Sequence, residues 1–142
     1  MNKFGDWFAA RSPELLSILR IMAALLFMEH GGMKLLGFPA AMPNGTVHVL
    51  SFFGVAGLLE IVGGGLVAIG LFTRAAAFVI SGEMAVAYFM AHAPHGFWPA
   101  LNHGEVAVLY CFVFLYLSAA GGGNWSLDRL IAARAVATTP EA

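Results

Sequence analysis

The sequence predicts an all-α integral membrane protein, a four-helix antiparallel bundle with short interfacial helices at both termini. The first reason is composition, because 60% of the 142 residues are hydrophobic and only 11% are charged. Ordinary soluble domains have about 45–50% apolar and about 25% charged residues, and a chain this short cannot bury such an excess in one core. The second reason is that the apolar residues fall into four stretches, each close to the roughly 20 residues that cross a bilayer.

These stretches define four predicted spans within a single membrane domain over residues 1–142. They cover residues 15–36, 49–72, 75–91 and 103–120. Thr73 and Arg74 form a polar break between the second and third spans, and a connection rich in Pro, Gly and His follows the third. The glycine run at 121–123 ends the fourth span.

Both ends of the chain carry short amphipathic segments. At the N-terminus, Phe4, Trp7 and Phe8 are typical of a helix lying in the membrane interface. After the last span, Ser126 is expected to cap a second short helix. The tail over residues 136–142 is expected to be disordered.

The distribution of positive charge predicts the orientation. Six of the seven Lys and Arg residues fall on one side of the four spans: Lys3, Arg11, Arg20, Arg74, Arg129 and Arg134. Only Lys34 lies on the other side, so the positive-inside rule places both termini in the cytoplasm of a bacterial cell, with the protein in the inner membrane. The chain has seven Lys and Arg residues and eight Asp and Glu residues, so it lacks the excess of positive charge that attracts nucleic acid.

Polar residues within the spans indicate a pocket that opens outward. Glu60 and Glu83 are predicted near the bilayer midplane, where an ionisable group usually faces the bundle interior. His30 and Lys34 are four residues apart and share a helix face. The candidate ligand-binding residues are His30, Lys34, Glu60, Asn102 and Glu105, and the proton-relay candidates are Glu60, Glu83 and Glu105.

Two glycines and three histidines admit plainer interpretations. Gly57 and Gly64 share a stripe with Glu60, which favours close helix packing over a ligand wall. The spacing H-x2-H-x7-H-x-E, from His92 through His103, matches no zinc pattern, so no metal site is expected. With Cys111 as the single cysteine, the chain has no CxxC centre, and it contains no haem, flavin or iron–sulfur motif.

The order of short motifs along the chain resembles the DoxX family. The matching segments are His30-Gly-Gly-Met-Lys34, Glu60-Ile-Val-Gly-Gly-Gly65, Ile69-Gly70-Leu-Phe-Thr73-Arg74, Gly82-Glu-Met84-Ala-Val-Ala87, Asn102-His-Gly-Glu105 and Gly121-Gly-Gly-Asn-Trp-Ser126. The resemblance implies a four-helix bacterial membrane protein, related to the DoxD subunit of a thiosulfate:quinone oxidoreductase. It implies that His30, Lys34, Glu60 and Glu105 match the family's recurrent polar positions, and it assigns no catalytic role to them.

The leading functional hypothesis is a membrane subunit of a redox system that binds quinone or quinol, or organises proton transfer, beside a partner oxidoreductase. Lys34 or His30 would bind a quinone carbonyl, and the buried acids would accept protons. A small proton-coupled transporter or channel-like protein and a membrane scaffold for soluble partners are the alternatives. Association into a homo-oligomer is compatible with each of these.

Overall fold

The computed structural model describes residues 3–137, and this part of the chain is helical without a strand. The predicted all-α fold class is confirmed. The helices are α1 (Lys3–Ala10), α2 (Ser12–Leu35), α3 (Phe52–Ile69), α4 (Thr73–Ala87), η1 (Tyr88–His92), η2 (Ala93–His95), α5 (Pro99–Asn102), α6 (Glu105–Ala120) and α7 (Leu127–Ala137).

Three helical segments within residues 3–137 are long and apolar enough to cross a membrane: Ser12–Leu35, Phe52–Ile69 and Thr73–His95. The fourth apolar helix, α6, has 16 residues and is shorter than these. Its late start has a local cause. His103 has a positive φ of 59° and Gly104 follows it, so the chain turns before Glu105 instead of continuing α5.

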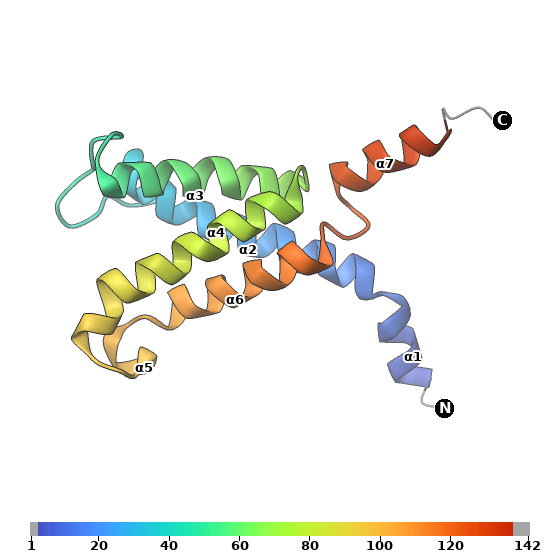
Figure 1. Ribbon diagram of the computed structural model, residues 1–142, viewed down its shortest axis with the longest axis horizontal. Helices are drawn as coiled ribbons and strands as arrows, with labels where there is room; N and C mark the ends of the chain where they lie inside the picture. The colour runs from blue at the N-terminus through green and yellow to red at the C-terminus, as the bar shows by residue number, and fades with distance from the viewer. Residues whose placement is uncertain (1–2, 138–142) are drawn as a thin grey trace.

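The four apolar helices pack as two pairs. α2 lies along α3, and α4 lies along α6, whereas α3 and α4 touch each other less extensively. Figure 1 shows α3 and α4 meeting at their short connection and separating toward the opposite end. The buried core lies between the pairs, around Phe27, Ile80, Phe114 and Leu117.

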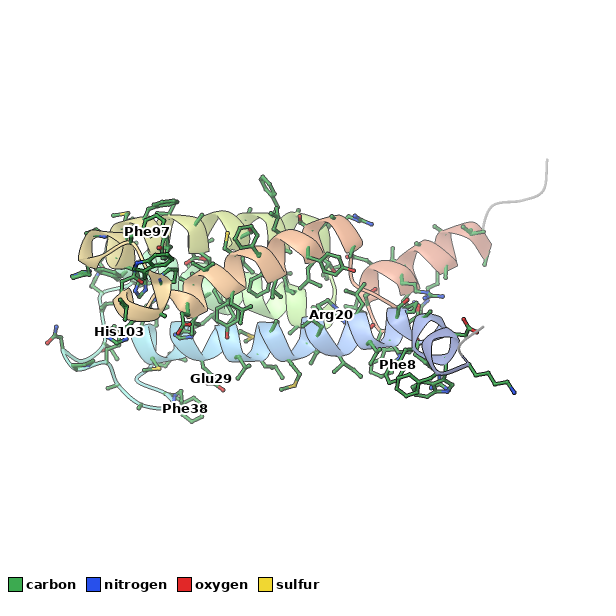
Figure 2. All side chains as sticks on the ribbon, turned by 90° about the horizontal axis from the view of Figure 1, so that it is seen from below. Phe8, Arg20, Glu29, Phe38, Phe97 and His103 are labelled. Atoms are coloured by element: carbon green, nitrogen blue, oxygen red, sulfur yellow. The ribbon has the colours of Figure 1, made fainter. Side chains whose placement is uncertain are left out.

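The end of the molecule that carries both terminal helices is tightly closed around Arg20 (Figures 1 and 2). This side chain is fully buried, and its guanidinium donates to four backbone carbonyls. We call this cluster the arginine clasp, which consists of Arg20 and the carbonyl groups of Val67, Ala68, Gly122 and Trp125. The last turn of a helix leaves carbonyls without partners, so Arg20 satisfies the end of α3 and fastens the glycine loop after α6 to it.

A second contact at this end closes the connection between α3 and α4. Gly70 has a φ of 73° and ends α3, and Phe72 has a φ of 50° at the start of α4. Phe72 carries no capping group, so Asp128 of α7 supplies one, accepting from the backbone N–H groups of Phe72 at 2.8 Å and Thr73 at 2.9 Å. Burial raises the pKa of Asp128, but these hydrogen bonds, with the charge of Arg20, lower that pKa by more, so the carboxyl stays ionised.

The terminal segments extend away from the packed helices. Helices α1 and α7 lie at the same end, and Phe4, Trp7 and Phe8 of α1 are exposed. Ser126 accepts from the N–H of Arg129 at 3.3 Å, as a cap of α7 should. Val136 and Ala137 are still helical, contrary to the disorder expected there, and the rest of the predicted disordered tail lies outside the described residues.

Candidate functional site

The centre of the site is an ion pair between α2 and α3. The ammonium Nζ of Lys34 lies 2.5 Å from Oε1 of Glu60, and it is the only ion pair within residues 3–137. Glu60 is 2% exposed and Lys34 is 18% exposed. The other carboxylate oxygen of Glu60, Oε2, is buried without a hydrogen-bond partner in the described residues. The ion pair therefore places the ammonium group of Lys34, a donor, beside Oε2 of Glu60, an acceptor without a hydrogen bond.

Glycines on both helices bring Lys34 and Glu60 together. A methyl group on Gly31 would lie 2.6 Å from the carbonyl oxygen of Gly57, closer than packed atoms approach. A methyl group on Gly57 would lie 3.2 Å from the Cβ atom of Lys34. Larger residues at these positions would separate α2 from α3, so the contact between the two charged groups depends on small residues. The expectation that Gly57 serves helix packing agrees with this geometry.

A large cleft lies beside the ion pair, where α3 and α4 diverge. It has a volume of about 780 Å³, and twelve of its sixteen lining residues are apolar. Lys34, Glu60, Glu83 and His92 are the polar ones. Several apolar lining residues are strongly exposed on the outer surface, including Phe52 at 60% and Met90 at 59%. The cleft therefore connects an apolar outer surface to a charged floor.

A second cavity, which we call the outer pocket, lies on the α6 side of the ion pair. It has a volume of about 360 Å³. Its residues are His30, Lys34, Glu60, Met84, Ala87, His92, His103, Val106, Ala107 and Tyr110. Lys34, Glu60 and His92 line both the outer pocket and the cleft, so the ion pair separates two cavities of different polarity.

Glu83 adds a second buried carboxylate to the cleft. Both of its oxygens are inaccessible to solvent, and neither has a hydrogen-bond partner within residues 3–137. Its charge interacts with those of Glu60 and Lys34. Two carboxylates beside one ammonium group leave an excess of acceptor atoms, which a protonated ligand or a proton on one acid would balance.

A local irregularity of the third span places His92 at this site. α4 continues into η1, a π-helical turn over Tyr88–His92. Such turns are rare and often occur at functional sites. His92 stacks on Tyr88 and its Nδ1 lies 3.1 Å from the carbonyl oxygen of Asn102, which fixes the ring between the two cavities.

The structure brings only some of the candidate residues together. His30, Lys34 and Glu60 line the outer pocket, whereas Asn102 and Glu105 line neither cavity. Asn102 is buried and holds the connection after η1, donating to the carbonyl of Gly96 at 2.7 Å. Glu105 is exposed in the first turn of α6. Asn102 and Glu105 would lie on one face only if a single helix contained both residues. The turn at His103 and Gly104 separates them into α5 and α6.

The sequence did not identify His92, His103 and Tyr110 as parts of one pocket. The two histidines were interpreted as residues of a polar connection, and a π-turn leaves no trace in apolar periodicity. No group of three or more His, Cys, Asp or Glu residues in the described part of the chain could hold a metal ion. The absence of a metal from this protein stays a prediction.

The fold and its apolar helices define an all-helical membrane protein with a charged site between its helix pairs. The sequence model of the DoxX family matches residues 15–93, more than half of the chain, and the chain belongs to this family. An uncharacterized protein of Haemophilus influenzae is 48% identical over 82% of this chain and 90% of its own length. An uncharacterized membrane protein of Mycobacterium tuberculosis is 28% identical over 90% of this chain and 88% of its own. No solved structure matches the chain significantly.

Proposed function

We propose that this protein is an inner-membrane subunit that binds a quinone or quinol in the cleft and works with a partner oxidoreductase. The observation that carries the proposal is the charged floor of the cleft: Lys34 and Glu60 lie at the base of an apolar cavity of about 780 Å³. A lipid-soluble ring with oxygen atoms at its edge matches both surfaces. Lys34 donates to a quinone carbonyl, and the unpartnered oxygen of Glu60 accepts from a quinol hydroxyl.

The acids also have a role in the proposed chemistry. A quinol that gives its electrons to the partner oxidoreductase releases its hydroxyl protons at the same time. Glu60 takes the first proton, and Glu83 in the same cleft takes the second. His92 connects the cleft with the outer pocket and offers the protons a way out of the site.

The decisive experiment measures quinone bound to purified protein. We expect a short-chain ubiquinone to bind to the wild type in detergent. Glu60→Gln and Lys34→Met each remove a charge-assisted hydrogen bond, worth about 1.5–3 kcal/mol, and should weaken binding about ten-fold or more. Glu29→Gln is the matched control, because Glu29 is an exposed acid on the outer side of α2, the helix that carries Lys34 (Figure 2). Equal affinity in the Glu60 and Glu29 variants would contradict quinone binding at this site.

We further propose that α2, α3, α4 and α6 all span the membrane as an antiparallel four-helix bundle, with α1 and α7 in the interface and both termini in the cytoplasm. Support comes from the cationic residues, of which all but Lys34 belong to the end formed by α1, α7 and the connection between α3 and α4. A reporter fused after Ala142 should be active only in a cytoplasmic form, and one inserted at His95 only in a periplasmic form. The reverse pattern would invert the orientation.

Proton-coupled transport is the second candidate, and the position of the ion pair between two cavities favours it. Release of Lys34 from Glu60 would connect the cleft with the outer pocket without any movement of a whole helix. In proteoliposomes, this function predicts a proton flux that Glu83→Gln reduces. A flux equal in wild type and Glu83→Gln would remove this candidate.

A further inference from the structure

A separate hollow lies at the other end of the molecule, around the glycine loop after α6. It has a volume of about 480 Å³. It is lined by Phe72, Arg74, Ala75, Ala120, Gly121, Gly122, Gly123, Ser126, Asp128 and Arg129. None of these residues contributes to the cleft or to the outer pocket. The hollow itself therefore shares no residue with the proposed quinone site, whereas Leu59 and Val79 of the groove beside it also line the cleft.

The hollow is positively charged. Arg74 and Arg129 are exposed at its wall, and neither forms an ion pair within residues 3–137. Part of the Arg74 guanidinium is already used, because it donates to the carbonyls of Ser118, Ala119 and Ala120 at the end of α6. Asp128 is the one acid in the lining, but both of its oxygens accept from the start of α4. The buried guanidinium of Arg20 lies directly behind the loop, donating to the carbonyl of Gly122 at 2.8 Å. Three cations surround the hollow against one carboxylate, so an anion is attracted to it.

An apolar groove adjoins the hollow, between α3 and α4. The groove has a volume of about 270 Å³ and is lined by Leu59, Val62, Gly63, Leu66, Phe72, Ala75, Ala76, Val79 and Ile80. Phe72 and Ala75 belong to both the groove and the hollow. From Leu59 to Leu66 the groove follows α3 for about 10 Å, which fits within one leaflet of a hydrocarbon core about 30 Å thick. Gly63 lets α3 approach α4 closely at the base of the groove, because a Cβ on Gly63 would lie 3.2 Å from the side chain of Ile80.

We propose that the hollow and the groove together bind one anionic phospholipid. Arg74 and Arg129 bind the phosphate, and one acyl chain lies in the groove against Phe72 and Ala75. Basic pockets between helices at the cytoplasmic side are suited to acidic headgroups. The apolar groove next to the cationic hollow favours a lipid over a free phosphate ion, because an ion would leave the groove uncovered.

The experiment is a lipid titration followed by native mass spectrometry of the full chain in one detergent. The probes are palmitoyl-oleoyl phosphatidylglycerol, phosphatidylcholine with the same acyl chains, and glycerol phosphate, which has no acyl chain. We expect one phosphatidylglycerol to be retained per chain, with weaker retention of phosphatidylcholine and none of glycerol phosphate. Equal retention of the two lipids, or binding of glycerol phosphate as strong as that of the lipid, would overturn the proposal.

Two variants separate the headgroup contact from the acyl contact. Arg129→Gln should lower the affinity for phosphatidylglycerol about five-fold, the effect of one basic group near an anionic headgroup. Its control, Arg134→Gln, removes the same charge from α7 outside the hollow and should change the affinity less than about two-fold. Ala75→Phe fills the groove and should lower the affinity about three-fold through lost packing alone. Its control, Ala9→Phe, adds the same ring at an exposed position of α1 that lines neither the hollow nor the groove.

The same spectra report the oligomeric state, which tests the alternative occupant of the groove. The lipid proposal expects Ala75→Phe to change the bound lipid and leave the mass of the protein assembly unchanged. A dimer that Ala75→Phe dissociates, with lipid retention equal to wild type, would identify a second copy as the occupant and overturn it. An affinity of Arg129→Gln equal to that of Arg134→Gln would also overturn it.

Discussion

The buried charges at the two ends of this protein have different hydrogen-bond partners. In the arginine clasp, every hydrogen bond of Arg20 goes to a backbone carbonyl, although Oε2 of Glu14 at the same end has no partner among residues 3–137. At the other end, Lys34 meets a carboxylate, three acid oxygens have no partner among residues 3–137, and the helices separate around the cleft. A buried charge with all its contacts satisfied holds a structure together, whereas one with acceptors to spare is available for a ligand.

The largest effect should come from Arg20→Met, which tests whether the clasp is structural. Removing the guanidinium takes a donor from four buried or half-buried carbonyls, of which that of Val67 keeps the N–H of Gly70, and we expect a loss of about 4 kcal/mol of unfolding free energy. Thermal unfolding in detergent measures this loss. The control is Arg11→Met, an exposed arginine near the same end, which should cost less than about 1 kcal/mol. Equal losses in the two variants would break the comparison between the two ends.

The next largest effect should come from Gly70→Ala, which tests how closely the clasp is packed. The backbone of Gly70 has a φ of 73°, and an added Cβ would lie 2.5 Å from the Cβ of Ser126. We expect a loss of about 2–3 kcal/mol in the same unfolding assay. Gly65→Ala is the matched control, because nothing lies within 4 Å of its added methyl group. That variant should be neutral or slightly more stable, and a loss like that of Gly70→Ala would contradict close packing as the cause.

Variants of the ion pair between Lys34 and Glu60 should lower the free energy of unfolding by less, and the double variant should be more stable than either single variant. Lys34→Met or Glu60→Gln alone leaves the other group without its partner and should cost about 1–2 kcal/mol. The double variant removes the isolated charge, so we expect it to be more stable than either single variant while quinone binding stays lost. A double-mutant cycle by thermal unfolding checks the sign. Additive losses would show that the pair contributes nothing by its interaction.

The smallest effect concerns Asp128 and appears only through pH. Because the pKa of Asp128 is lower in the folded protein than its ordinary value near about 3.9, its stabilising contribution is present above that value and lost as the pH falls through the folded pKa. We expect Asp128→Asn to cost about 1 kcal/mol at pH about 7 and nothing below the folded pKa. Unfolding curves of both proteins across acidic pH test this. A difference that persists unchanged in acid would contradict a charge-dependent cap.

The sequence predicted the helical class and the burial of Glu60, because both depend on strong local signals. Apolar stretches nearly long enough to cross a membrane predict helices directly. A single acid within such a stretch predicts that its side chain faces the interior of the bundle. The glycines beside it indicated close helix packing. The sequence placed Lys34 and Glu60 in one candidate pocket, and the direct ion pair between them came from the structure.

Other features depend on contacts between distant residues and leave no local signal. The four acceptors of Arg20 lie 47 to 105 positions further along the chain, and no spacing rule connects them. His92 reaches the cleft because of a π-turn, and Glu105 leaves it because the chain turns at His103. The cap of α4 likewise comes from Asp128, far away in the sequence.

The arginine clasp also sets an order on biosynthesis. The ribosome makes Arg20 early, together with the helix that carries it into the membrane, but two of its acceptors are Gly122 and Trp125 near the other end of the chain. During translation the guanidinium of Arg20 stays in contact with water at the membrane surface until the loop after α6 has been made and folds over it. The nascent protein therefore has only the carbonyls of Val67 and Ala68 for Arg20 until residues 122 and 125 have been made.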